Sequence, residues 1–316
     1  MAKSFPADAG KTNIDQGTDD PKQARSELAD LVDKFNTTKG VLAPLAAMVV
    51  GDGLTVTDEG AGNADTLSVT PAPSATLPRG HLTGLKLSNN TTDATNDIDI
   101  AEGQCRSEDN VEDIILASTL TKRLDASWVV GTNQGGLDTG AVSSTGTYHV
   151  HAILRSDTGV VDALFSLSPT APTLPASYDY SRRIGSFMRQ SGVNVPFVQD
   201  GDLFQRAPVY QSNTTSTTAV SRTLGVPTGL NVLARFRANG GFSTVDDGAL
   251  FTDLAMADVA PSAAAAPGIS TPFNTRGWGD FEVRTNTSAQ IRERSTEAAT
   301  VEIVTYAWID RRGRDD

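Results

Sequence analysis

The two histidines at positions 149 and 151 have the spacing of a metal site. They lie in residues 147–154, a run whose β-branched and aromatic residues predict a strand. Because side chains alternate between the two faces of a strand, His149 and His151 are expected on one face. Imidazole suits iron, zinc or nickel, and three chains around an axis would bring six such rings together. The alternative is a pair of ordinary core or surface histidines on a hairpin.

Carboxylates gather between residues 93 and 113, where they could serve two kinds of chemistry. Calcium takes oxygen-rich loops, and sugar hydrolysis takes two carboxylates at a fixed separation. The spacing matches no EF-hand loop, and nothing in the sequence selects two of the carboxylates. A solvated acidic face is the default interpretation. The carboxylate residues of this region are Asp93, Asp97, Asp99, Glu102, Glu108, Asp109, Glu112 and Asp113.

Other catalytic signatures are absent from the sequence. Residues 9–12 imitate the end of a phosphate loop, but Phe5 stands where the first glycine is required. The chain has three histidines and one cysteine, Cys105, so it has no disulfide framework or four-cysteine zinc site. No nucleophile elbow and no paired-histidine zinc motif occur. We therefore predict no catalytic residues, no cofactor and a non-enzymatic protein.

A sugar-stacking surface is a further candidate. Tyr178, Tyr180, Trp278 and a glycine-rich loop at residues 131–136 could supply it. Aromatic residues make up only 6% of the chain, so the alternative places the tryptophans in the core.

Composition excludes several classes of partner. The net charge of −12 argues against binding to nucleic acid or to an anionic membrane, since both require a basic face. The longest apolar run, residues 41–50, is interrupted by Pro44 and is too short to span a bilayer. No apolar signal segment follows Met1, which predicts synthesis in a cytoplasm and no membrane insertion.

The pattern along the chain predicts a mainly β protein with antiparallel, sandwich-like domains. Short β-rich runs separated by turns recur without helical patterns between them. The expected divisions are an arm with a helix at 1–40, a linker or small β segment at 41–79, a β domain at 80–210, and a second β domain or its continuation at 211–316. The runs include strands at 54–57, 97–100 and 301–309, hairpins joining 147–154 to 160–165 and 281–285 to 290–293, and a strand at 230–237 before an Asn239-Gly240 turn.

The arm is polar and extended, and it leads into one short amphipathic helix. Its leader has too little apolar surface to fold alone, and Pro21 suits the first helical turn. The apolar stripe must meet its own domain, copies of itself or a larger partner, because so short a helix is marginal in water. The candidate attachment residues are Phe5, Ile14, Pro21, Leu28, Leu31 and Phe35.

Residues 5–36 resemble the N-terminal attachment segment of tailed-bacteriophage virion proteins, especially tail fibres. Two further stretches look like the same group. One runs from residue 80 to about 202 and includes residues 85–90, 121–125, 135–140, 147–151 and 155–159. The other is residues 308–314.

The resemblance implies a virion component, commonly trimeric, with its N-terminus fixed to other virion proteins. It transfers no catalytic residues. We expect a tail fibre or spike, made in the host cytoplasm, whose β domains contact a host-surface polysaccharide or another receptor. The alternatives are an architectural head, neck or tail protein, or a polysaccharide depolymerase.

Overall fold

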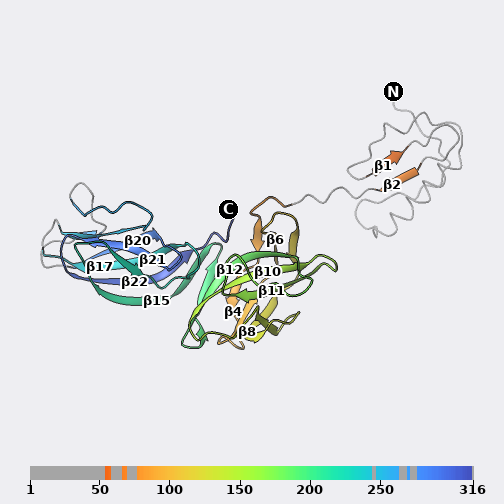
Figure 1. Ribbon diagram of the computed structural model, residues 1–316, viewed down its shortest axis with the longest axis horizontal. Helices are drawn as coiled ribbons and strands as arrows, with labels where there is room; N and C mark the ends of the chain where they lie inside the picture. The colour runs from red at the N-terminus through yellow and green to blue at the C-terminus, as the bar shows by residue number, and fades with distance from the viewer. Residues whose placement is uncertain are drawn as a thin grey trace, which may run out of the picture. The chain divides into compact units, whose positions relative to one another are not determined.

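The computed structural model describes residues 77–243, 247–262 and 276–314, together with strands at 54–57, 66–69 and 269–270 (Figure 1). The chain divides into two compact units, Met1–Thr76 and Leu77–Asp316. In the first unit, β1 (Leu54–Thr57), a predicted strand, pairs antiparallel with β2 (Thr66–Val69). The predicted helix and the attachment residues lie outside the described residues: Phe5, Ile14, Pro21, Leu28, Leu31 and Phe35.

Every regular element in the described ranges is a strand, which confirms the prediction of a mainly β protein. Across those ranges, no helix has the length and apolar character needed to cross a membrane. The second unit contains a curled, barrel-like sheet of eight strands and a small three-stranded sheet in its first half (Figure 1). In sheet order the eight are β13 (Val193–Asn194), β12 (Tyr180–Gln190), β10 (Gly146–Arg155), β11 (Val160–Ser166), β9 (Gln134–Leu137), β8 (Leu120–Ser127), β5 (Asp97–Ile100) and β4 (Leu87–Asn89), and the three are β3 (Leu82–Gly84), β6 (Gly103–Arg106) and β7 (Asp113–Leu116).

The β10–β11 hairpin is the centre of this sheet and was predicted from sequence. Its strands pair antiparallel from Arg155↔Val160 to His149↔Ser166, and Gly159 takes the left-handed conformation in the turn (φ 70°). Both faces of β10 are covered. Tyr148 packs in the main core, where its ring stacks on Phe187 (5.8 Å between centroids). Residues on the other face, including His149 and His151, are therefore buried as well.

Strand β9 makes the sheet mixed, because it runs parallel to both β8 and β11. The predicted loop at residues 131–136 is wrong over its second half, since Gly135 and Gly136 lie in this strand and are buried. A Cβ atom on Gly135 would lie 1.9 Å from the Ser127 carbonyl oxygen, and one on Gly136 would lie 2.9 Å from the Phe165 ring. The glycines therefore permit close approach of strands and do not mark a turn.

The second half of the unit is a two-layer sandwich (Figure 1). One layer has the order β14 (Phe197–Asp200), β15 (Leu203–Thr214), β22 (Thr300–Ile309), β17 (Leu233–Gly241) and β20 (Arg276–Arg284). The other has the order β16 (Val220–Thr223), β21 (Gln290–Ser295), β18 (Gly248–Thr252) and β19 (Ile269–Ser270). Phe251 of β18 packs edge-on against Phe236 and Phe281 of the first layer, with centroids 5.3 and 5.0 Å away. The strand predicted at residues 301–309 is β22, which lies in the centre of the five-stranded layer.

Two turn predictions in this half are wrong. Asn239 and Gly240 continue β17, opposite Trp278 and Gly277 on one side and Glu302 and Val301 on the other. Ladder bonds on both sides hold this dipeptide extended. The predicted hairpin at 281–293 is instead a crossing between layers: β20 lies in the five-stranded sheet and β21 in the four-stranded one.

Candidate functional site

The histidine pair lies in the interior of its own chain. His149 is 1% exposed and His151 is 2% exposed. His149 Nδ1 is 2.8 Å from Ser186 Oγ, and His151 Nε2 is 3.1 Å from the Ser168 carbonyl oxygen. Gly229 packs against His149, where an added Cβ would lie 2.9 Å from Nε2.

Burial decides the protonation of both rings. Burial, together with the nearby Arg183 guanidinium, lowers the pKa of His149 to about 3. Burial also lowers the pKa of His151 to about 4, against the opposing hydrogen bond to Ser168. No group of three or more histidine, cysteine or acidic side chains placed to hold a metal occurs among the described residues. These observations favour the second interpretation of the pair, that of ordinary core histidines.

A buried arginine–aspartate network joins the C-terminal segment to the barrel-like sheet. Arg183 donates two hydrogen bonds to Asp310, at 2.6 and 2.8 Å, and Asp310 is 3% exposed. Although burial opposes it, these hydrogen bonds hold the pKa of Asp310 below its usual value. Arg182 donates to the carbonyl oxygens of Arg312 and Gly313 at 3.1 and 2.7 Å. The network therefore fastens residues after β22 onto β12 and has the character of a structural joint.

Lys122 and Asp162 form an ion pair with no exposure to solvent. Lys122 Nζ lies 3.1 Å from Asp162 Oδ1 and donates to the carbonyl oxygens of Val129 (2.7 Å) and Gly131 (3.3 Å). Asp162 accepts hydrogen bonds from the backbone N–H groups of Gly131 and Ala163 at 2.7 and 2.6 Å. Each charged group therefore has several partners, as a structural buried pair requires.

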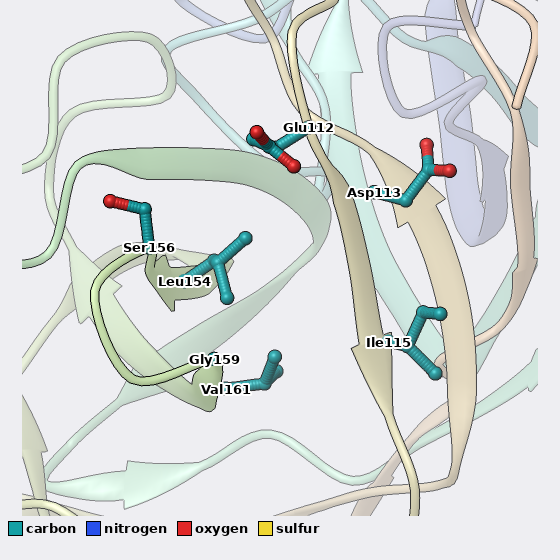
Figure 2. A pocket seen from close by; sticks show the side chains of 7 residues that line it. All are labelled: Glu112, Asp113, Ile115, Leu154, Ser156, Gly159 and Val161. Atoms are coloured by element: carbon teal, nitrogen blue, oxygen red, sulfur yellow. The ribbon is translucent and has the colours of Figure 1, made fainter. Parts of the chain in front are cut away.

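A shallow pocket of about 300 Å³ contains two of the carboxylates considered for sugar hydrolysis (Figure 2). Glu112 and Asp113 line it with five other residues: Ile115, Leu154, Ser156, Gly159 and Val161. Asp113 accepts hydrogen bonds from Arg106 (2.8 Å) and from the Leu77 N–H group (3.3 Å). Asp113 is therefore held in an ion pair with Arg106, as a structural carboxylate is.

The other predicted carboxylates are divided among separate local structures. Asp99 accepts hydrogen bonds from Asn90 (2.9 Å) and Thr121 (2.7 Å), and Asp93 closes its own turn. Burial and the neighbouring Asp93 raise the pKa of Asp97 to about 6. Cys105 is buried, which raises the pKa of its thiol to about 12 and makes the thiol unreactive.

The outer face of the five-stranded sheet exposes aromatic rings held by polar partners. Trp278 on β20 is 58% exposed, and Tyr210 on β15 is 60% exposed. The Arg237 guanidinium lies 6.0 Å from the Trp278 ring centroid and is itself held by Asp280 through two hydrogen bonds of 3.0 and 3.1 Å. We call this face the aromatic face and define it by Trp278, Arg237, Asp280, Tyr210, Glu302 and Asn239.

The middle of the aromatic face is a chain of hydrogen bonds. Tyr210 donates its hydroxyl hydrogen to Glu302 Oε1 at 3.1 Å, and Asn239 donates to Glu302 Oε2 at 2.9 Å. The strand register places Asn239 opposite both Glu302 and Trp278. The two exposed rings are therefore connected across four strands by fixed polar groups.

The sequence-based sugar-stacking set is only partly reproduced. Trp278 is exposed, whereas Tyr178 is buried against Trp128, with ring centroids 5.1 Å apart. Sequence reasoning missed Tyr210 and Arg237 as partners of Trp278, although Arg237 and Asp280 lie in runs where apolar and polar residues alternate. Their proximity comes from strand pairing, which the alternation alone does not specify.

No family model and no curated protein matches this chain. Among solved structures, the chain is similar to a structure of the infectious bursal disease virus Gx strain, with 11% identity, a TM-score of 0.16 and coverage of 76% of this chain and 78% of that one. It is similar to the VP2 subviral particle of infectious bursal disease virus at 10% identity, with a TM-score of 0.14 and the same coverage. Likeness at these TM-scores carries no argument about fold or function.

Proposed function

We propose that this chain is a structural protein of a tailed-bacteriophage virion, a tail fibre or spike fixed by its N-terminal arm. The β unit would project outward and attach the particle to the host surface. The structural observation that supports attachment is the aromatic face, where the two large rings of Trp278 and Tyr210 are exposed. The sequence observation is the resemblance of residues 5–36, 80–202 and 308–314 to virion proteins.

The proposal includes a non-enzymatic role and a homotrimer. Weak contacts made by identical subunits add through multivalency, so a trimer would strengthen attachment without any new contact. The ion pairs of Asp113, Asp162 and Asp310 support a structural role for these carboxylates. Light scattering on the purified full chain measures the mass directly: a trimer supports the fibre, and a monomer contradicts this part of the proposal.

The anchor is tested by deleting residues 1–36. Phage particles are assembled in the presence of the full chain or the truncated chain, purified on a density gradient and probed with an antibody against the β unit. We expect the truncated protein to remain soluble and to be missing from particles. Incorporation of the truncated chain at the level of the full chain would refute the anchor.

The second candidate is an architectural head, neck or tail protein that contacts neighbouring virion subunits. The observation that favours it is the exposed apolar side chain of Ile115 on β7, at the edge of its sheet, with exposed Val111 nearby. Adsorption separates the candidates. The purified β unit should compete with particles for host cells if it is a fibre, and should have no effect on adsorption if it is architectural.

A further inference from the structure

We propose that the aromatic face binds a neutral polysaccharide, with Trp278 and Tyr210 as its two stacking platforms. This inference rests on the proposed attachment function and deepens it by naming the class of receptor and the residues that would contact it. Four observations support it: the exposure of the rings, their fixed orientation, the balance of charge and the extent of the face.

Exposure is the first observation. Phe281 on β20 contributes to the sandwich core through its ring contacts with Phe236 and Phe251. Trp278, on the same strand, points to the other side and is 58% exposed. A large ring in this position adds little to the core, whereas its face is available to the C–H groups of a sugar ring. The electron-rich face of an aromatic ring attracts such weakly positive hydrogens.

Fixed orientation is the second observation. The Arg237 guanidinium lies near the Trp278 ring, and the two hydrogen bonds to Asp280 fix the guanidinium in turn. On the other side, Glu302 holds the Tyr210 hydroxyl group and is itself held by Asn239. A surface that is ordered before binding loses less conformational entropy when a ligand binds.

Charge is the third observation. Two cations of this sheet face are paired with anions beside them: Arg237 with Asp280 at 3.0 Å, and Arg235 with Glu282 at 2.6 Å. Such pairs offer donors and acceptors to hydroxyl groups without a net field that would select a charged ligand. Nucleic acid and anionic polymers require an excess of cations, so a neutral saccharide fits this face better.

The extent of the face is the fourth observation. Trp278 lies on β20 and Tyr210 on β15, and the sheet order places β17 and β22 between them. Three strand spacings of about 4.8 Å separate β15 and β20 by roughly 14 Å. Glu302 and Asn239, which are polar, occupy the interval. This alternation of ring, polar group and ring suits several successive sugar units, whereas a protein interface has a contiguous apolar centre.

The test is binding of the purified full chain to an array of neutral bacterial surface polysaccharides. We expect the unmodified chain to bind at least one of them, and Trp278→Ala to weaken that binding about tenfold or more. Tyr210→Ala should weaken it in the same direction. The matched control is Leu167→Ala, which truncates an equally exposed apolar side chain (59%) on the other half of the unit. Thermal melting of each variant checks that the fold is retained.

Three results would overturn the inference: no neutral polysaccharide is retained, Trp278→Ala binds as the unmodified chain does, or Trp278→Ala lowers the mass of an oligomer in light scattering without changing glycan binding. The last would make this face an interface between copies of the chain. Particle incorporation is scored separately with the antibody described above. Failure of the array with normal incorporation rejects only the glycan site, whereas absence of the full chain from particles rejects the proposed virion function.

Discussion

Acidification from pH 7 to pH 5 is expected to destabilise the second unit through His149 and His151. Their folded-state pKa values, about 3 and about 4, lie below the ordinary value of 6.5. At pH values between the folded-state pKa of each ring and the ordinary value, the unfolded chain binds protons that the folded chain does not. The free energy of unfolding therefore falls as the pH falls. Each imidazole that stays neutral at pH 5 lowers the free energy of unfolding by about 2 kcal/mol relative to pH 7, or roughly 4 kcal/mol for the pair.

Other groups around the rings modify this sum. Arg183 near both rings opposes their protonation, whereas Asp310 near His149 and Asp138 near His151 favour it. Elsewhere, the folded-state pKa of Asp97, about 6, exceeds its ordinary value of 3.8. The folded state therefore binds the extra proton there, which offsets the loss by about 1 kcal/mol between pH 7 and pH 5.

A double variant isolates the histidine contribution. In His149→Asn and His151→Gln, the new amides can replace the ring nitrogens that face Ser186 and Ser168. Urea unfolding followed by circular dichroism at pH 7 and pH 5 gives the free energy of unfolding of each protein. The difference between the two pH values should be roughly 4 kcal/mol larger for the unmodified chain. Equal pH dependence of the two proteins would refute the reasoning.

Three substitutions test the buried contacts. Asp162→Asn should lower the free energy of unfolding by about 3–5 kcal/mol, since it leaves the buried ammonium of Lys122 without its counter-ion. The double variant Lys122→Met with Asp162→Leu should recover most of that loss, and urea unfolding measures both proteins. No loss in the single variant would show that the carbonyl groups suffice. Asp310→Asn should weaken the joint by about 3 kcal/mol, seen as faster hydrogen exchange in the C-terminal segment, and unchanged exchange would contradict a structural joint. Gly136→Ala should cost about 1–3 kcal/mol in thermal or urea unfolding, whereas Gly146→Ala, where an added Cβ meets nothing within 4 Å, should be nearly neutral; equal effects would contradict the close approach.

The local sequence pattern was sufficient to predict strands and turns where one strand pairs with the next along the chain. The alternation in β5 and the turn ending at Gly159 depend on neighbouring residues, so both were predicted correctly. Mainly β architecture likewise follows from short apolar runs separated by turns. The sequence also indicated Trp278 as a candidate stacking residue, but it did not specify the residues that surround it.

Tertiary structure decided every feature that depends on residues far apart in the chain. Asn239-Gly240 reads as a turn, but strands on both sides keep it extended. Gly135 and Gly136 read as a loop, but the close approach of Ser127 and the Phe165 ring requires glycine there.

The contacts of the candidate sites follow the same rule. Arg183 and Asp310 are 127 residues apart, and Tyr210 and Glu302 are 92 residues apart. Composition and periodicity describe which face of a strand a residue occupies. Which other strand lies beside it is fixed by long-range pairing and packing, so the sequence alone indicated the types of group available, and the fold decided which of them meet.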